Sequence, residues 1–215
     1  MYNLLKKEFK LSLHPTSYLF LPLAAMLLIP SYPYYVAFFY QTLGIFFIFL
    51  NGNTNNDLFF TTLLPIRKTD AVKARFFTVI ALELLQMVIA IPFACLRGRI
   101  NPVENLAGME ANPALFGLVL IMFALFNIVF LPAFYKTGYK TGLPYILSCT
   151  AMIVYAGIVE VIIQLTPALK QSLDTLSGAY LPQQLAVLGL GIVVYALLTY
   201  LAFVWSARRF ERLDL

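Results

Sequence analysis

The sequence has few charged residues, two cysteines and a single histidine, and each shortage excludes a class of protein. Only 12% of its 215 residues are Asp, Glu, Lys or Arg, whereas a soluble domain averages about 25%. Both cysteines, Cys95 and Cys149, lie in apolar runs and form no Cys-x-x-Cys pair. Because His14 is the one histidine and no Cys/His cluster exists, we expect no metal site.

The chain also lacks the motifs of ATPases, dinucleotide-binding proteins and hydrolases. A phosphate-binding loop needs a Gly-Lys pair followed by Ser or Thr, and no Gly-Lys pair occurs. Residues 188–191 have too few glycines for a dinucleotide fingerprint, and neither GxSxG nor HExxH is present. We therefore expect no catalytic residue and no cofactor in this chain. If ATP drives the protein, another chain hydrolyses it.

Apolar residues are abundant instead, at 61% of the chain with a mean hydropathy of +0.82. This composition predicts an all-α integral membrane protein, with residues 1–215 forming one transmembrane domain. A helix needs about 20 residues to cross a bilayer. The last four apolar runs reach that length, whereas the first two are shorter and are separated by Pro30 and Pro33. The six predicted spans are residues 17–30, 34–50, 76–96, 114–134, 142–165 and 184–206.

Charge placement favours six crossings over five. With the N-terminus inside, twelve Lys and Arg residues fall on cytosolic segments and three, Arg97, Arg99 and Lys170, on outer segments. Merging the first two runs into one span would leave six inside against nine outside. Because Lys and Arg accumulate on the cytosolic side, we expect six spans with both termini cytosolic.

Residues 1–14 predict an interfacial helix ahead of the first span. Four apolar residues recur at helical spacing on one face, and the lysines between them can reach lipid headgroups. This helix would anchor the chain to the membrane surface, and it could also touch a cytosolic partner. The apolar face consists of Tyr2, Leu5, Phe9 and Leu13.

Two segments are expected on the outer side. Residues 97–113 are polar and contain Gly and Pro, which predicts a loop. In residues 166–183, leucines recur at i, i+4 and i+7 after Pro167, which predicts a short helix lying in the interface.

The connector between the second and third spans, residues 53–75, combines charge with an apolar stripe. Pro65 lacks an N–H and disfavours helix just before it. We expect a short helix over 57–64, a corner, and a second helix capped by Thr69 that enters the third span. A solvated loop is the alternative, but apolar anchors beside Arg and Lys are typical of a protein-binding surface. The predicted docking residues are Leu58, Phe59, Leu63, Leu64, Pro65, Ile66, Arg67 and Lys68.

Two glutamates fall inside predicted spans, where ionisable groups are costly and are candidates for function. Their carboxyls could form helix–helix hydrogen bonds, which is the structural interpretation. Alternatively, they line a translocation cavity or provide a counter-charge for a cationic substrate. With the neighbouring amides, the candidate polar residues of a translocation path are Glu83, Gln86, Asn127, Glu160 and Gln164.

The order of these segments, together with the connector sequence LLPIRKTDAVKARF, resembles the membrane subunit of type-2 ABC exporters, in particular the small bacterial ABC-2 permeases. The resemblance in architecture covers essentially the whole chain. One departure is the absence of a serine beside the first arginine of the motif. The motif consists of Leu63, Leu64, Pro65, Ile66, Arg67 and Lys68, followed by Val72, Lys73, Arg75 and Phe76.

This resemblance implies roles that composition alone does not. Residues 1–14 would be the elbow helix, and the connector would be the coupling helix that docks on a separate ATP-binding subunit. ATP and Mg would be bound by that subunit. A second permease subunit, identical or different, would complete the transporter in a bacterial cytoplasmic membrane. The complex would export a peptide, a lipid or a drug-like molecule.

Other functions stay open on the sequence alone. An ion-coupled carrier would use the two intramembrane glutamates to bind protons or cations, although carriers usually contain a repeat with broken helices in matching places. A non-transport membrane scaffold or sensor would use the same cytosolic surface. Nothing in the sequence indicates nucleic-acid binding, since the net charge of +5 reflects membrane topology.

Overall fold

The computed structural model describes residues 2–12, 15–100, 105–137 and 140–213, and the regular elements in these ranges are all helices. The prediction of an all-α integral membrane protein is therefore confirmed. Five of the described helices are long and apolar enough to cross a membrane. They are α3 (Tyr34–Thr54), α5 (Lys68–Ile100), α6 (Pro113–Thr137), α7 (Gly142–Leu165) and α9 (Leu181–Glu211).

A shorter apolar segment precedes them and has an unusual geometry. Its α-helical part, α2 (Pro15–Phe20), has six residues and continues into the eight-residue 3₁₀ helix η2 (Leu21–Leu28). A 3₁₀ helix rises about 2.0 Å per residue against about 1.5 Å for an α-helix. The segment is thus about 25 Å long, close to the thickness of the hydrocarbon layer. The tighter winding lets an apolar run that is too short for an α-helical span cross nearly the whole layer.

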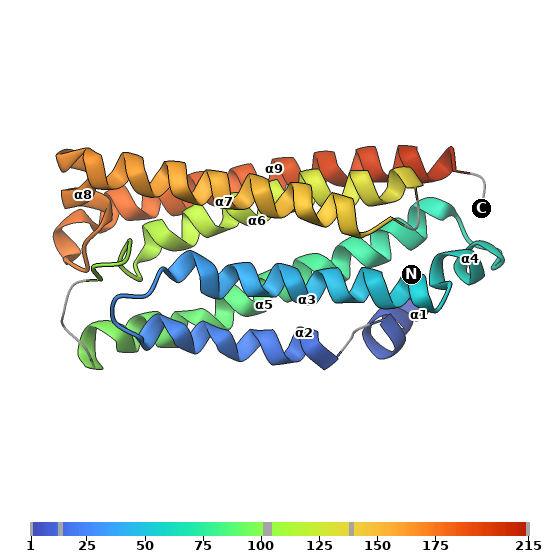
Figure 1. Ribbon diagram of the computed structural model, residues 1–215, viewed down its shortest axis with the longest axis horizontal. Coiled ribbons are helices and arrows are strands. Elements are labelled where there is room, and N and C mark those ends of the chain that lie inside the picture. The colour runs from blue at the N-terminus through green and yellow to red at the C-terminus, as the bar shows by residue number, and fades with distance from the viewer. Residues whose placement is uncertain (1, 13–14, 101–104, 138–139, 214–215) are drawn as a thin grey trace.

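The helices lie side by side in an elongated bundle (Figure 1). At one end are α1 (Tyr2–Lys7), α4 (Asp57–Thr62) and the last turn of α9, and at the other end is α8 (Pro167–Leu173). Because α1 and the end of α9 share one end, the chain runs along the bundle an even number of times. The segment α2–η2 is the first of these passes along the bundle.

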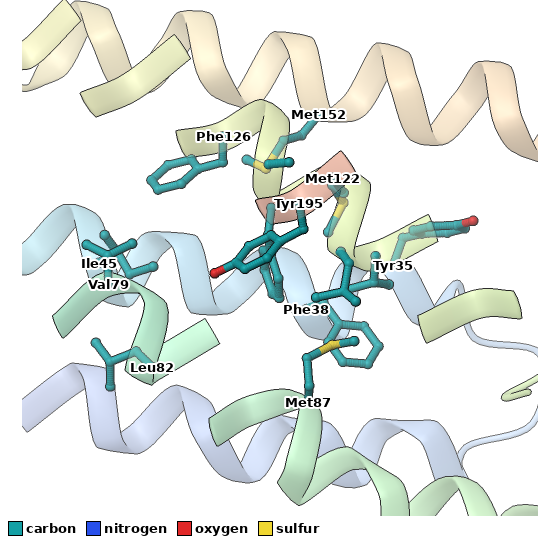
Figure 2. Close-up of a cluster of buried hydrophobic side chains, with 14 of the residues drawn as sticks. Tyr35, Phe38, Ile45, Val79, Leu82, Met87, Met122, Phe126, Met152 and Tyr195 are labelled. Atoms are coloured by element: carbon teal, nitrogen blue, oxygen red, sulfur yellow. The ribbon is translucent and has the colours of Figure 1, made fainter. Parts of the chain in front are cut away.

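Helix α6 lies at the centre of the bundle, where it packs most extensively against α9 and α7. Its buried side chains meet residues of three other helices. Figure 2 shows Phe38 of α3 beside Met87 of α5, and the cluster also contains Met122 and Phe126 of α6 and Tyr195 of α9. By contrast, much of the apolar surface of α7 and α9 faces outward, as expected for helices in contact with lipid.

The closest approach between α6 and α9 requires two glycines. A Cβ atom at Gly117 would lie 2.5 Å from the carbonyl oxygen of Val187 and 2.7 Å from the Cα of Leu188. A Cβ at Gly191 would collide with the backbone of Gly117. Small residues allow such backbone contacts, which strengthen helix pairing inside membranes.

Several boundaries differ from the predicted ones. The first crossing begins and ends two residues earlier than 17–30, and α3 continues four residues beyond position 50. Helix α4 ends at Thr62 instead of 64, because the chain turns two residues before Pro65. Helix α5 begins at Lys68, so Thr69 is not its N-cap.

The N-terminal and outer segments also differ from the predictions. The interfacial helix is α1 followed by a π-helical turn, η1 (Glu8–Ser12), and the predicted positions 1, 13 and 14 lie outside the described residues. The predicted loop 97–113 begins inside α5, which extends to Ile100, and positions 101–104 lie outside the described residues. In the predicted interfacial segment 166–183, α8 is followed by the 3₁₀ turn η3 (Gly178–Tyr180).

The rest of the predicted outer loop is folded into the protein. Asn105, Glu110 and Asn112 are all buried. The Asn112 amide donates hydrogen bonds to the carbonyl oxygens of Leu173, the last residue of α8, and of Thr175. Arg97 is fully buried, and its Nε donates to the Tyr34 hydroxyl at 2.6 Å. These contacts hold the segment before α6 against α8, and the Arg97 guanidinium at the end of α5 lies 3.7 Å from the Glu110 carboxylate.

The glycine contact generates a test of the helix packing. We expect Gly191→Ala to lower the free energy of unfolding by about 1–3 kcal/mol, because the added methyl overpacks a rigid backbone contact. The matched control is Gly189→Ala on the same helix, whose Cβ would meet no atom within 4 Å. Thermal unfolding of the purified protein in detergent compares them. Equal melting temperatures would contradict the proposed close contact.

Candidate functional site

The connector forms a compact hairpin at the end of the bundle that carries α1. Helix α3 ends at Thr54, and Asn56 then adopts a left-handed backbone conformation (φ 51°), which Asn tolerates better than most residues. This reversal starts α4, which lies across the end of the bundle (Figure 1). The chain then turns through Pro65 and enters α5 at Lys68.

An apolar cluster on this hairpin is exposed. Phe59, Phe60, Leu63 and Leu64 have 47%, 60%, 66% and 50% of their surfaces accessible. The rings of Phe59 and Phe60 contact each other edge to face. We call these four residues the apolar cluster. Leu58, which the sequence placed in the same stripe, instead packs against the core.

The two basic residues of the predicted docking segment, Arg67 and Lys68, have different contacts. Pro65 and Arg67 are exposed beside the apolar cluster, and Ile66 is half-buried. The Lys68 amine donates to the carbonyl oxygen of Leu213 at 2.6 Å and lies 5.8 Å from the ring centre of Phe210. Lys68 thus holds the end of the chain, whereas Arg67 is available to a partner.

A buried ion cluster fastens the hairpin to the bundle. The Arg75 guanidinium, on the first turns of α5, contacts the Glu8 carboxylate at 2.7 Å and the Asp57 carboxylate at 2.6 Å. The Arg75 side chain is 5% exposed, so these bonds form away from solvent. It also lies 5.3 Å from the ring centre of Phe49. One guanidinium therefore joins α5, α4 and the N-terminal segment.

Lys7 completes this cluster from the N-terminal helix. Its amine lies 2.6 Å from an Asp57 carboxylate oxygen and donates to the Thr61 hydroxyl at 2.8 Å. Glu8 lies 3.5 Å from the same amine. We define the ion cluster as Lys7, Glu8, Asp57 and Arg75. Sequence patterning missed it, because Asp57 and Arg75 are 18 positions apart and Lys7 and Thr61 are 54 apart.

Glu83 lies in a second, fully buried polar group at the middle of the bundle. Its Oε2 accepts hydrogen bonds from Asn127 at 3.0 Å and from the Tyr195 hydroxyl at 2.6 Å. The Asn127 amide also lies 3.3 Å from the Thr199 hydroxyl. These contacts link α5, α6 and α9, which is the arrangement that the structural interpretation of Glu83 requires. Sequence analysis did not identify Tyr195 or Thr199.

The other predicted polar residues have different neighbours. The Gln86 amide donates to the Ala37 carbonyl at 2.8 Å and so joins α5 to α3. The Gln164 amide donates both to Glu160 at 3.1 Å and to Asp174 at 3.0 Å. Glu83 and Glu160 share no hydrogen-bond partner among the described residues, so the five predicted residues form separate groups instead of one continuous path. Within the same residues, no three His, Cys, Asp or Glu side chains are grouped to hold a metal ion.

Comparison with known proteins identifies one match. A family model described as ABC-2 family transporter protein matches residues 3–211. The match covers the N-terminal helix, the connector and all the membrane crossings. No curated protein and no solved structure matches the chain.

The ion cluster generates a stability test. We expect Arg75→Leu to lower the free energy of unfolding by about 3–5 kcal/mol, because it leaves two buried carboxylates without their cation. Arg75→Lys should lower the free energy of unfolding by less than Arg75→Leu does, because the lysine amine keeps the positive charge. It should not match the wild type, since an amine cannot bind both carboxylates with the fixed geometry of a guanidinium.

The control for this test is Lys73→Leu, which removes an exposed cation from the same helix and should change stability by less than about 0.5 kcal/mol. Thermal unfolding in detergent provides the measurement. An Arg75→Leu protein as stable as Lys73→Leu would show that the cluster contributes nothing to holding the hairpin.

Proposed function

The chain belongs to the ABC-2 transporter family, as the multi-pass membrane permease of an ABC transporter, and on this basis we propose that it is the membrane subunit of an ATP-driven exporter. A permease of this family has no catalytic activity of its own, and membership implies association with an ABC ATP-binding subunit. In this proposal, one surface of the chain binds the ATP-binding subunit, and a helix transmits the movement of that subunit into the membrane domain.

The apolar cluster with Arg67 is the proposed docking surface. Its four apolar side chains are exposed at the end of the bundle that also carries the ion cluster. Aromatic and aliphatic anchors beside an arginine are enriched at protein–protein interfaces. This exposure, on a hairpin fixed to the bundle, is the observation that carries the proposal.

The ion cluster is the proposed mechanical link. Helix α5 has 33 residues and is therefore about 50 Å long, enough to run from the hairpin to the opposite end of the bundle. Because Arg75 holds α4 and the N-terminal segment against the first turns of α5, a displacement of the hairpin moves that helix up to Pro92, where the backbone lacks a hydrogen bond. Rigid elements of this kind transmit motion between sites when they have two stable arrangements.

The remaining assignments complete the proposed complex. ATP and Mg are bound by the ATP-binding subunit, and a second permease chain, identical or different, pairs with this one. Both termini and the hairpin face the cytosol of a bacterial cell, in keeping with the charge asymmetry of the sequence. The transported molecule moves outward and is a peptide, a lipid or a drug-like compound.

The docking surface generates a binding test. We expect Leu63→Ala combined with Arg67→Glu to weaken association with the ATP-binding subunit by about thirtyfold or more, because loss of one central anchor alone is worth about 2 kcal/mol. Co-purification of the tagged protein from its native membrane measures the association, and an ATPase assay on the same fractions identifies the partner.

The matched control places the same two changes at the opposite end of the bundle. Leu106, which is 83% exposed, is changed to Ala together with Arg99→Glu, and this variant should retain the partner. Both variants should keep their melting temperatures, since the altered side chains are exposed. If the Leu63/Arg67 variant co-purifies with as much ATP-binding subunit as the wild type, the docking surface lies elsewhere.

A further inference from the structure

A cavity of about 480 Å³ opens between α3 and α7 near the outer end of the bundle. Its size falls within the range of small-molecule sites. The wall is apolar and rich in aromatic and thioether groups, including Tyr35 and Phe39 of α3, Met122 of α6 and Met152 of α7. Figure 2 shows Tyr35, Met122 and Met152 gathered from these three helices.

Glu160 provides the one carboxylate in the described wall of this cavity. Its Oε1 accepts a hydrogen bond from Gln164, and the backbone amide of Met109 faces the carboxyl. Oε2 is hidden from solvent and has no hydrogen-bond partner of standard geometry among the described residues. The acceptor capacity of this carboxylate is therefore only partly used.

A second acid, Asp174, lies close to Glu160, and Lys170 lines the neighbouring pocket on the far side of Gln164. Gln164 bridges Glu160 to Asp174, whose other oxygen accepts from the backbone amide of Glu110 at 2.8 Å. No Lys or Arg of the described chain forms an ion pair with Glu160 or Asp174. The cavity wall is therefore apolar, with an electronegative group at one end.

Two glycines keep the space beside the carboxyl open. A Cβ at Gly108 would come within 3.4 Å of the Glu160 carboxyl atoms, so the backbone passes close to them. A Cβ at Gly157 would meet no atom within 4 Å. Larger residues at these positions would crowd the carboxyl or reduce the cavity.

We propose that this cavity binds a compact lipophilic cation, with the charge beside Glu160 and the apolar body among the aromatic and methionine side chains. An intramembrane carboxylate without a counter-ion favours a cation, and aromatic faces and thioethers attract cationic and apolar groups. An anion of the same shape would be repelled by Glu160 and Asp174. The inference rests on the proposed transport function and narrows its substrate to drug-like cations.

The test compares two ions of matched shape and opposite charge, tetraphenylphosphonium and tetraphenylborate. Equilibrium binding of each is measured on the full chain in lipid nanodiscs without any ATPase. We expect saturable binding of the phosphonium and none of the borate. Glu160→Gln should weaken phosphonium binding by about tenfold or more, because it removes the negative charge that attracts the cation at a site where the effective dielectric constant is low.

Two further variants separate a binding site from a general effect of charge or folding. Gly157→Leu keeps the carboxylate but fills the cavity, and it should also weaken phosphonium binding. Asp70→Asn removes one negative charge from the other end of the bundle and should leave binding unchanged. Melting temperatures of all variants establish that each is folded.

Equal phosphonium binding by the wild type and Glu160→Gln, or equal binding of phosphonium and borate by the wild type, would overturn the proposal. The assay contains no ATP-binding subunit, so failure of the proposed export function would not alter its result. Phosphonium binding that depends on Glu160 would therefore support the site even if the assembled complex did not export.

Discussion

The arrangement of the bundle end that carries the hairpin depends on one buried cation. Arg75 at the start of α5 is held by Glu8 from the N-terminal segment and by Asp57 from α4. A guanidinium can satisfy both carboxylates at once because its donors point in different directions. Without it, the two acids would be buried without a counter-charge, and the hairpin would lose its attachment to the long helix. With Arg75 in place, α4 and its exposed Phe59 and Phe60 side chains are fixed to the long helix α5.

Hydropathy and charge asymmetry predicted much of this fold. They located the five long apolar helices and the connector between α3 and α5, because each depends on local composition. The 3₁₀ winding of η2 and the burial of Asn105 and Glu110 were not predictable in the same way. Asn105 donates to the carbonyl of Tyr32, and the Glu110 amide donates to Asp174, so their burial depends on residues 73 and 64 positions away.

The candidate site was predictable to a smaller extent. The apolar residues before Pro65 were visible as a stripe in the sequence. In the structure, however, Leu58 packs against the core and Phe60 is exposed. Which of these residues faces inward depends on how the helix is rotated about its own axis, and the sequence of the stripe does not determine that rotation. Lys68 and Arg67 are adjacent and chemically alike, yet Lys68 binds the carbonyl of Leu213. The ion cluster joins residues from three separate segments, so no periodicity in one segment could reveal it.

The two intramembrane glutamates illustrate how environment separates identical side chains. Glu83 accepts two hydrogen bonds from helices α6 and α9 at the centre of the bundle. Glu160 lies at the edge of an open apolar cavity with one oxygen unpartnered.

We propose above that the hairpin carrying Phe60 and Leu64 meets an ATP-binding subunit. The most direct test of this proposal replaces Leu64 with a photo-crosslinking amino acid in cells and identifies the product by mass spectrometry. We expect a crosslink to an ABC ATP-binding subunit at this position and none when the crosslinker replaces Leu106 at the opposite end. Crosslinks to lipid alone, or the same product from both positions, would contradict the proposal.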